Sequence, residues 1–260
     1  MGYLLALFIG LSLGLIGGGG SILTVPILVY LFDIPPVLAT SYSLFIVGVT
    51  SFVGSITHWA TNKLDMRMVL IFGLASVMTV FCIRHYIIPN LPQEISISGL
   101  SIPVSFITMM LFALLMIVSS FSMIRTHEHE QTSQHNTSVL KILGYGVGVG
   151  LVTGLLGAGG GFLLIPALVL LLRLPVKRAV GTSLLIITIN SLIGFADDVT
   201  HHNMDWKLLL KITGVSIAGI LIGIALGKRM DGSVLKKGFG WFVLLMGIYI
   251  IVHEISLITT

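Results

Sequence analysis

Charged residues are scarce in this sequence of 260 residues. Asp, Glu, Lys and Arg together make up 9% of it, apolar residues make up 55%, and the mean hydropathy is +1.07. A water-soluble domain needs about 25% charged residues, because polar groups must cover its surface. The composition therefore excludes a soluble globular protein and predicts a polytopic membrane protein.

Cysteine and the common catalytic motifs are also lacking. The single Cys82 excludes a disulfide framework and a paired-cysteine metal site, and its apolar surroundings indicate a small buried side chain. There is no G-x-x-x-x-G-K-[ST] loop, and residues 157–160 have no βαβ context for a dinucleotide. Basic residues form no aromatic-interleaved patch, which argues against nucleic-acid binding. Neither an enzyme nor a cofactor is expected.

Long apolar runs are what the sequence has instead. Six of them approach or reach the length of about 20 residues that crosses a bilayer. They are residues 39–57, 68–88, 102–124, 179–195, 208–226 and 239–252. Two longer stretches, 3–32 and 141–172, would as straight helices measure about 45 Å against a hydrocarbon core of about 30 Å.

Glycines interrupt both of the longer stretches midway, at residues 17–20 and 157–161. Consecutive glycines break a helix, so each stretch is expected to form two half-helices around a non-helical turn. The fold class predicted is all-α, with eight long apolar segments, or ten when half-helices are counted.

The chain repeats itself at an offset of 140 residues, with Gly14 matching Gly154, Pro26 matching Pro166 and Ser51 matching Ser191. Two transmembrane repeats, residues 1–124 and 139–260, are expected on either side of a polar linker, residues 125–138. The linker carries His127, Glu128, His129, Glu130 and His135. For these residues a solvated connection is favoured over a metal-binding tract.

The distribution of Lys and Arg indicates how the repeats are oriented. If each broken stretch returns to its starting side, eleven of the fourteen basic residues share one side and only Arg84, Lys207 and Lys211 lie on the other. If each broken stretch crosses once, the split is eight against six. The positive-inside rule favours the first arrangement. The repeats are therefore expected to be inverted, with the linker in the cytoplasm and both termini outside.

Inverted repeats with a broken helix at the same place in each half are typical of secondary transporters, which bind substrate near the membrane midplane. Backbone N–H groups at the start of a half-helix favour an anion, and hydroxyl groups and the Asn190 amide can add donors. The predicted substrate-binding residues are Gly18, Gly19, Gly20, Ser21, Thr24, Ser41, Ser43, Gly159, Gly160, Gly161, Thr182, Ser183 and Asn190. No Lys or Arg is expected mid-span beside the broken helices.

A site without a fixed cation leaves charge balance to a coupling ion such as a proton. The candidates for proton coupling are His58, Asp197, Asp198 and His201. For these residues solvated positions at segment ends are the favoured interpretation. A passive anion channel is an alternative function, and a membrane-embedded metalloenzyme built on the Asp197 to His202 cluster is a less favoured one.

Other residues are interpreted structurally. Arg84 and His85 indicate an interface anchor, and Trp59, Trp206 and Trp241 indicate interfacial aromatics. Glycines spaced by four residues indicate close helix packing, and they are Gly10 and Gly14, Gly150 and Gly154, and Gly219, Gly223 and Gly227. The last series also allows a homodimer.

The glycine motifs resemble a known family. They are Gly14-Leu15-Ile16-Gly17-Gly18-Gly19-Gly20 with Pro26, the copy Gly154-Leu155-Leu156-Gly157-Ala158-Gly159-Gly160-Gly161 with Pro166, and Ala179-Val180-Gly181-Thr182-Ser183. Over nearly the whole chain the sequence is similar to the TauE/SafE family of sulfite and organosulfonate exporters. The resemblance implies an inner-membrane transporter of sulfur oxyanions such as sulfite, thiosulfate or sulfonates, without fixing the substrate or the direction. Thr40-Ser41-Tyr42-Ser43 departs from the Gly-Thr-Ser form of the second half.

Overall fold

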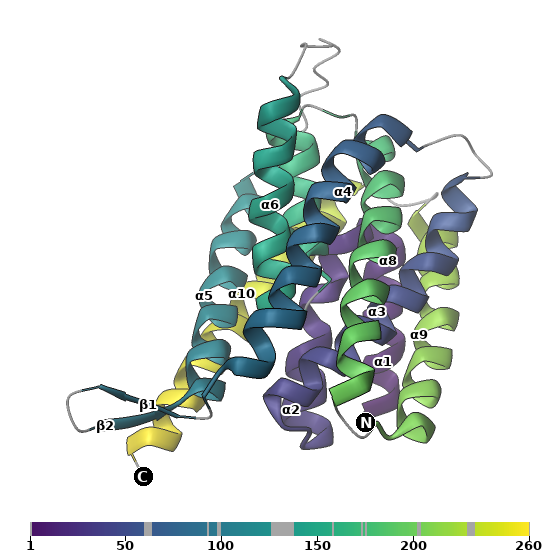
Figure 1. Ribbon diagram of the computed structural model, residues 1–260. Helices are drawn as coiled ribbons and strands as arrows, with labels where there is room; N and C mark the ends of the chain where they lie inside the picture. The colour runs from purple at the N-terminus through teal and green to yellow at the C-terminus, as the bar shows by residue number, and fades with distance from the viewer. Residues whose placement is uncertain are drawn as a thin grey trace.

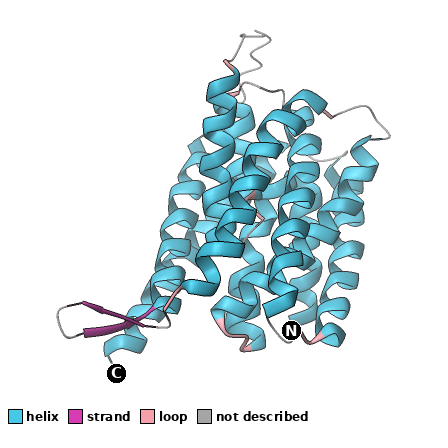
Figure 2. Ribbon diagram, in the orientation of Figure 1, coloured by secondary structure: helices cyan, strands magenta, loops and turns pink. Residues whose placement is uncertain are grey.

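The protein is a bundle of long helices that run roughly along one axis (Figure 1). The computed structural model describes residues 2–59, 64–92, 94–97, 100–125, 138–157, 159–172, 174, 176–201, 204–227 and 232–259. Helix makes up nearly all of this chain (Figure 2). Among the described residues, six helices are long and apolar enough to cross a membrane. The prediction of an all-α polytopic membrane protein is therefore confirmed.

A broken hairpin opens the first half. α1 (Gly2–Ile16) runs inward from the N-terminus, the 3-10 helix η1 (Gly17–Leu23) reverses the chain, and α2 (Thr24–Phe32) returns to the same end of the bundle (Figure 1). Asp33 ends α2 in the left-handed conformation, with φ of 52°, and its N–H is donated to the carbonyl of Leu28. We call this end of the bundle, where both chain termini lie, the terminus end.

The first half continues through α3 (Pro36–Trp59) and α4 (Met66–Cys82), which is extended by the π-helix η2 (Ile83–Ile87) and the 3-10 turn η3 (Ile88–Asn90). Two short antiparallel strands, β1 (Glu94–Ile97) and β2 (Leu100–Pro103), follow at the terminus end, with Glu94 opposite Pro103 (Figure 2). Neither of these strands is predicted from the sequence. α5 (Val104–Arg125) then runs to the opposite end, which we call the linker end because residues 125–138 begin there (Figure 1).

The second half starts at the linker end. α6 (Val139–Leu156) runs inward, a glycine turn follows, and α7 (Gly161–Pro166) with the π-helix η4 (Ala167–Leu171) leads back to the linker end (Figure 1). The remaining helices are α8 (Val176–His201), α9 (Trp206–Gly227) and α10 (Gly232–Thr259). The two broken hairpins thus enter the bundle from opposite ends.

The two halves interlock. α1 packs along α9, and α6 packs along α4. A Cβ added to Gly10 would collide with the Ser216 carbonyl, and a Cβ added to Gly150 would lie 2.6 Å from the Ser76 carbonyl oxygen. The two contacts are equivalent in the repeat, because Gly10 and Gly150 are separated by the 140-residue offset, as are Ser76 and Ser216. The spaced glycines therefore serve helix packing, as the sequence predicts.

Two interhelical hydrogen bonds are related by the same offset. The backbone N–H of Asp65 donates to Thr182 Oγ1 at 3.0 Å, and that of Asp205 donates to the Tyr42 hydroxyl at 2.6 Å. Each aspartate also caps the helix that follows it, since its carboxylate accepts the N–H three residues on. Tyr42 therefore takes the place of Thr182 in the first half, which accounts for that departure from the Gly-Thr-Ser form.

Glycines of the Gly219 series lie against α1. A Cβ on Gly219 or Gly223 would collide with the carbonyls of Leu7 and Leu11, and on Gly227 it would lie 3.6 Å from Leu15 Cδ2. These glycines already pack against α1 of the same chain. They therefore offer no basis for the homodimer that the sequence alone allows.

The Gly219→Ala substitution should lower the melting temperature in detergent by about 2–10 °C. The added methyl group must push apart two backbones in contact, and overpacking costs about 1–3 kcal/mol. Gly214→Ala on the same helix is the matched control, because no atom of the described residues lies within 4 Å of its added Cβ. Equal melting temperatures for the two variants would contradict the packing assigned to Gly219.

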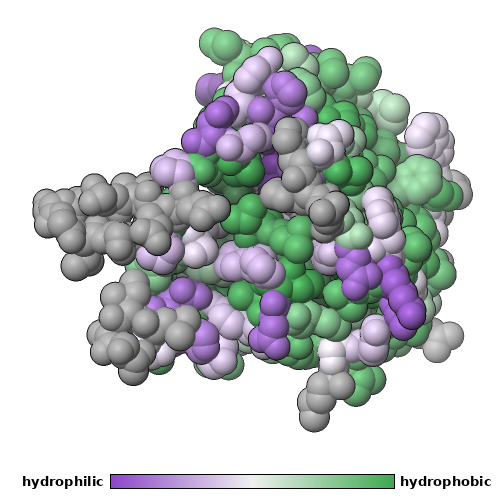
Figure 3. Space-filling view, turned by 60° about the horizontal axis from the view of Figure 1, so that its bottom comes forward, coloured by the Kyte–Doolittle hydropathy of each residue, from purple (hydrophilic) through white to green (hydrophobic). Residues whose placement is uncertain are grey.

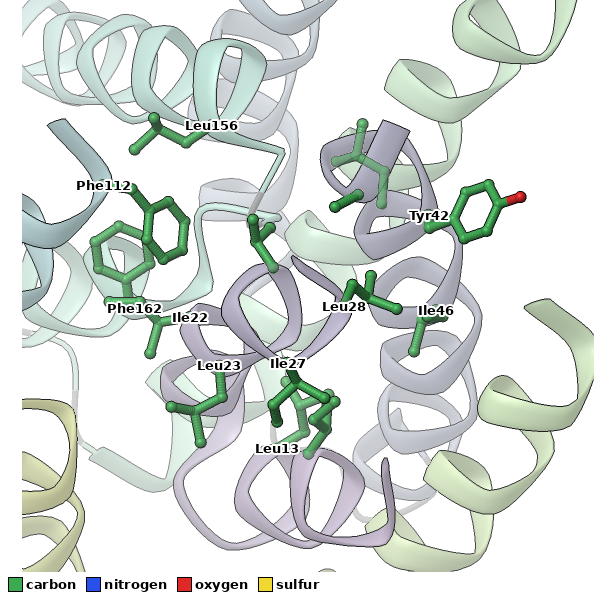
Figure 4. Packing of buried hydrophobic residues seen from close by; sticks show 14 of the residues in the cluster. Leu13, Ile22, Leu23, Ile27, Leu28, Tyr42, Ile46, Phe112, Leu156 and Phe162 are labelled. Atoms are coloured by element: carbon green, nitrogen blue, oxygen red, sulfur yellow. The ribbon is translucent and has the colours of Figure 1, made fainter. Parts of the chain in front are cut away.

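Apolar side chains from both hairpins form one core. In Figure 4, Ile22 and Leu23 of η1 lie on the side of the first hairpin that faces Phe162 of α7 and Phe112 of α5. Each of these four side chains is buried. The tip of the first hairpin is therefore held by packing against α7 and α5 and not by its own short helices.

Large apolar side chains are exposed along the long helices, as lipid contact requires, and Leu70, Leu74 and Met78 show this on α4. Trp59, Trp206 and Trp241 are exposed as well. Figure 3, which brings the terminus end forward, shows hydrophilic residues in separate groups among apolar ones. Cys82 is exposed on the surface of α4, so the expectation of a buried cysteine is wrong.

Candidate functional site

The tips of the two broken hairpins touch at glycine. A Cβ added to Gly18 would lie 2.5 Å from the Gly161 Cα and 2.6 Å from its carbonyl oxygen. Ile187 of α8 contacts the same point, with its Cδ1 atom 2.5 Å from that Cβ position. Only residues without side chains allow two backbones to approach this closely. The sequence-predicted Gly18 and Gly161 are thus brought together in the interior of the bundle.

The second break is an open turn. Gly157, Gly159 and Gly160 all have positive φ, between 65° and 67°, which a residue with a side chain rarely adopts. The first intrahelical bonds of α7 run from the N–H groups of Leu163 and Leu164 to the carbonyl of Gly160, at 3.1 and 3.0 Å. Gly161 and Phe162 come before the first of these donors in the chain. Their N–H groups therefore have no carbonyl acceptor within α7.

The first break has a different form. Only Gly17 has positive φ, and residues 17–23 continue as a 3-10 helix, which uses backbone N–H groups in its own hydrogen bonds. The expected non-helical turn is therefore present in the second half only. Gly19 lies within η1, and Gly20 packs against Ser12 and Leu13 of α1. Right-handed backbone at these glycines lets the chain coil through the break.

Several hydroxyls are buried on α2, α3 and α8, which all contact the tip of the first hairpin. Five of them have no hydrogen-bond partner within the part of the chain that the structure describes, and each belongs to a side chain with 0% exposure. They are the hydroxyls of Thr24, Ser43, Thr50, Ser51 and Ser191, which we call the buried hydroxyl set. Buried hydroxyls in proteins are normally hydrogen-bonded, and each unsatisfied one costs about 1–3 kcal/mol.

This set is centred on α3 and α8, the two long helices that pack on each other. Ser191 Oγ lies 2.9 Å from the Cβ position of Gly159, and Ser191 Cβ lies 3.1 Å from that of Gly48. Ser43, Thr50 and Ser51 lie at spacings of seven and eight residues, which places them on one face of α3. Of this set, only Thr24 and Ser43 are among the substrate-binding residues predicted from the sequence. Ser51 and Ser191 were detectable as a matched pair of the repeat.

Asn190 of α8 lies beside the set and is also buried. Its Nδ2 donates to Ser76 Oγ of α4 at 2.6 Å, while Oδ1 has no hydrogen-bond partner among the described residues. Asn190 therefore contacts a neighbouring helix, α4, through its amide nitrogen.

Other predicted hydroxyls are engaged elsewhere. Ser21 donates to the Gly18 carbonyl at 2.8 Å, Ser183 donates to the Val180 carbonyl at 2.8 Å, and Ser41 lies 3.5 Å from the Val37 carbonyl. Such bonds to the preceding turn are the ordinary state of small hydroxyls in apolar helices. Thr182 accepts the N–H of Asp65 and so belongs to the start of α4.

An arginine lies inside the bundle near this site. Arg84 of η2 is 1% exposed, and its Nη1 donates to Asp198 Oδ2 at 2.7 Å and to Thr40 Oγ1 at 3.3 Å. One sequence interpretation is therefore wrong: Arg84 is no interface anchor, because its side chain is buried against Asp198 and Thr40. The cause is the contact of α4 with α8, which covers a position that the apolar run alone places near a membrane surface.

A second pair lies next to the first. His85 Nδ1 is 2.8 Å from Asp197 Oδ1, and its ring stacks on Phe81 with centroids 5.3 Å apart. Asp197 and Asp198 belong to the last turns of α8 and not to a solvated loop, and Asp198 is 4% exposed. Adjacent basic residues in one apolar run and adjacent acids in another were the signal that could have revealed this pairing.

The predicted proton-coupling residues do not come together. His58 lies in the last turn of α3 at the linker end, where its Nδ1 is 3.0 Å from the Gly54 carbonyl, whereas Asp197 and Asp198 lie at the terminus end. The side chain of His201, His202 and the linker histidines lie outside the described residues. Within the described part of the chain, no group of three His, Cys, Asp or Glu residues could hold a metal ion.

Comparisons with known proteins agree with this architecture. The family model described as "Sulfite exporter TauE/SafE" matches residues 3–250. A probable membrane transporter protein of Xylella fastidiosa is 30% identical over 252 residues, covering 94% of this chain and 91% of that protein. A probable membrane transporter protein of Methanocaldococcus jannaschii is 24% identical over 95% of this chain and 94% of its own length. No solved structure matches the chain significantly.

Proposed function

The chain belongs to the TauE/SafE family and is a multi-pass membrane transporter, and from this premise we propose that it carries small sulfur-containing oxyanions by alternating access. The substrate class covers sulfite, thiosulfate and organosulfonates. The buried hydroxyl set carries the proposal, because it offers O–H donors without acceptors on helices that contact the tip of the first hairpin, with Ser191 beside the Gly159 turn. An oxyanion supplies several acceptors at once.

The N–H groups at the start of α7 add to these donors. They are oriented by the Gly159 and Gly160 turn, and Ser191 lies beside that turn. The substrate-binding residues in this proposal are Gly18, Thr24, Ser43, Gly159, Gly160, Gly161 and Asn190, together with Thr50, Ser51 and Ser191. Backbone and hydroxyl donors recognise charge and size, which suits a pyramidal or tetrahedral anion.

Alternating access follows from two inverted repeats, residues 1–124 and 139–260, with residues 125–138 as a cytoplasmic linker. Entry of the hairpins from opposite ends and the contacts that recur at the 140-residue offset support this arrangement (Figure 1). In this proposal the terminus end faces outward from the cell inner membrane, as the positive-inside rule requires. Movement of one repeat against the other would expose the site to each side in turn.

Charge balance is part of the same proposal. A proton can accompany the anion, and the acids Asp197 and Asp198 at the terminus end are the described candidates for its exchange, since both are ionisable groups in the last turns of α8. The absence of solvent exposure throughout the buried hydroxyl set favours a carrier over a passive channel, which needs a continuous aqueous path.

Flux through proteoliposomes tests the proposal. Labelled sulfite, thiosulfate and sulfoacetate should enter vesicles that contain the protein, and unlabelled substrate inside should accelerate this entry several-fold, because a loaded carrier reorients and exchanges its substrate. Protein-free vesicles and vesicles tested with labelled phosphate are the controls. Flux without acceleration by internal substrate would identify a channel, and no flux of any sulfur oxyanion would refute the proposed substrate class. Metal bound in the purified protein would instead favour the enzyme alternative.

A further inference from the structure

Arg84 has donors that its known partners do not use. Its Nε and Nη2 atoms are buried and form no hydrogen bond with any described residue, while Nη1 alone contacts Asp198 and Thr40. In a guanidinium group, the Nε and Nη2 hydrogens point in parallel along one edge. This edge matches two oxygens of a carboxylate, phosphate or sulfonate group. Asp198 bonds to Nη1, so the edge suited to bidentate anion binding faces no acceptor among the described residues.

The surroundings of Arg84 connect it to the transport site. Thr40, which accepts from Arg84, packs against the second glycine turn, with its carbonyl oxygen 2.6 Å from the Cβ position of Gly157. The Cβ atom of Ile83, the residue before Arg84, lies 2.9 Å from the position of a Cβ added to Gly154. Gly194 of α8 leaves room beside the Arg84 stem, whose Cγ is 3.8 Å from the Gly194 Cβ position. The guanidinium therefore lies among α3, α8 and the turn between α6 and α7.

The backbone around Arg84 is one of two π-helical segments among the described residues. Arg84 belongs to the π-helix η2, in which the N–H of Ile88 bonds to the Ile83 carbonyl five residues back. Single π-turns inside α-helices occur frequently at functional sites, and they require a compensating benefit because they are intrinsically unfavourable. The repeat offers no second copy of this cation, because the matching position holds Ile224 and the match of Asp198 is His58. The charge is thus specific to the terminus end.

We propose that Arg84 is an anion ligand at the terminus end of the transport path, and that Asp198 is the counterion with which the substrate competes. The substrate class is a small oxyanion that presents two oxygens to Nε and Nη2. Asp198 holds the guanidinium in place when no substrate is bound, and it weakens anion binding enough for release. This inference rests on the proposed anion transport and adds to it a charged subsite between the buried hydroxyl set and the terminus end.

Anion binding to purified full-length variants tests this role. The decisive variant is Arg84→Gln with Asp198→Asn, which removes both charges together and so leaves neither buried alone. Its affinity for sulfite and sulfoacetate, measured by calorimetry, should fall about 10- to 100-fold, the loss expected for one charge-assisted bidentate contact. Asp198→Asn alone should instead bind these anions several-fold more tightly and show a larger rise in melting temperature on anion addition, because Arg84 then has no competing carboxylate.

Two further variants separate binding from folding. Arg84→Lys keeps the charge and the ion pair with Asp198 but lacks the planar edge, so its affinity should fall about 5- to 20-fold with little change in melting temperature. Arg67→Gln is the matched control, since Arg67 lies on the same helix, is exposed, and belongs to the opposite end of the bundle. Its affinity should equal that of the wild type.

The outcomes distinguish this inference from the proposed function. Wild-type affinity in the doubly neutral variant, or unchanged affinity in Asp198→Asn, would make the pair purely structural and overturn the inference while leaving anion transport intact. Binding of phosphate or acetate in place of sulfur oxyanions, lost in the doubly neutral variant, would support Arg84 and overturn the substrate class. Failure of the wild-type protein to bind any of these anions would overturn both.

Discussion

Gly161→Val should reduce transport of the sulfur oxyanion by about 100-fold or more in proteoliposomes. Its side chain has no space, because the backbone of Gly18 occupies the position of the added Cβ. The hairpin tips must then separate, which moves the N–H groups of Gly161 and Phe162 away from the substrate. Loss of two hydrogen bonds to a charged group, at about 1.5–3 kcal/mol each, corresponds to this factor.

Folding and function must be separated in this experiment. Gly144→Val and Gly148→Val on α6 are the controls, because the described residues place no atom within 4 Å of either added Cβ, and both should transport like the wild type. Gly161→Ala offers a milder perturbation that is expected to show a smaller loss. Normal transport by a stably folded Gly161→Val protein would remove the hairpin contact from the mechanism.

The double variant Ser51→Ala with Ser191→Ala should lower substrate affinity about 100-fold or more while leaving the melting temperature unchanged or higher. Both hydroxyls belong to the buried hydroxyl set. In the substrate-free protein, removing them removes two unsatisfied donors and their desolvation cost, which should stabilise the fold. In the bound state each is expected to donate to a charged oxyanion, at about 1.5–3 kcal/mol. Stability and affinity should therefore change in opposite directions.

A bonded hydroxyl on the same helix is the control. Thr188 of α8 donates to the Leu184 carbonyl at 2.8 Å, so Thr188→Val should leave substrate affinity unchanged. Calorimetric titration of sulfite or sulfoacetate measures the affinity, and thermal unfolding in detergent measures the stability. A drop in melting temperature without a loss of affinity would show that Ser51 and Ser191 only pack the helices.

The positions of the helix breaks were predictable from local chemistry. α1 ends at Ile16 and α6 ends at Leu156, each directly before a glycine run that the sequence marks. The form of each break was not predictable. The second run forms a non-helical turn with positive φ at Gly157, Gly159 and Gly160, whereas the first continues as a 3-10 helix. Glycine permits both backbone conformations, so packing against the rest of the bundle selects between them.

The positions of the polar residues in the repeat were likewise predictable, but their hydrogen-bond partners were not. The sequence places Ser43, Ser183 and Thr182 at matching or neighbouring positions of the repeat, yet only the Ser43 hydroxyl belongs to the buried hydroxyl set. Ser183 bonds to its own helix and Thr182 bonds to Asp65. Which partner a hydroxyl finds depends on its rotamer and on the neighbouring helix, and neither is encoded in spacing along one segment.

Scarce charge, apolar run length and glycine runs act locally, so the amino-acid sequence alone predicts a helical membrane protein with two broken helical stretches. The contact of Gly18 with Gly161 and the buried pair of Arg84 with Asp198 depend instead on how the helices pack. Such contacts join residues more than 100 positions apart. The position of a charged residue within an apolar segment indicates its depth in the membrane. The neighbouring helix determines whether its side chain contacts lipid, water or an opposite charge.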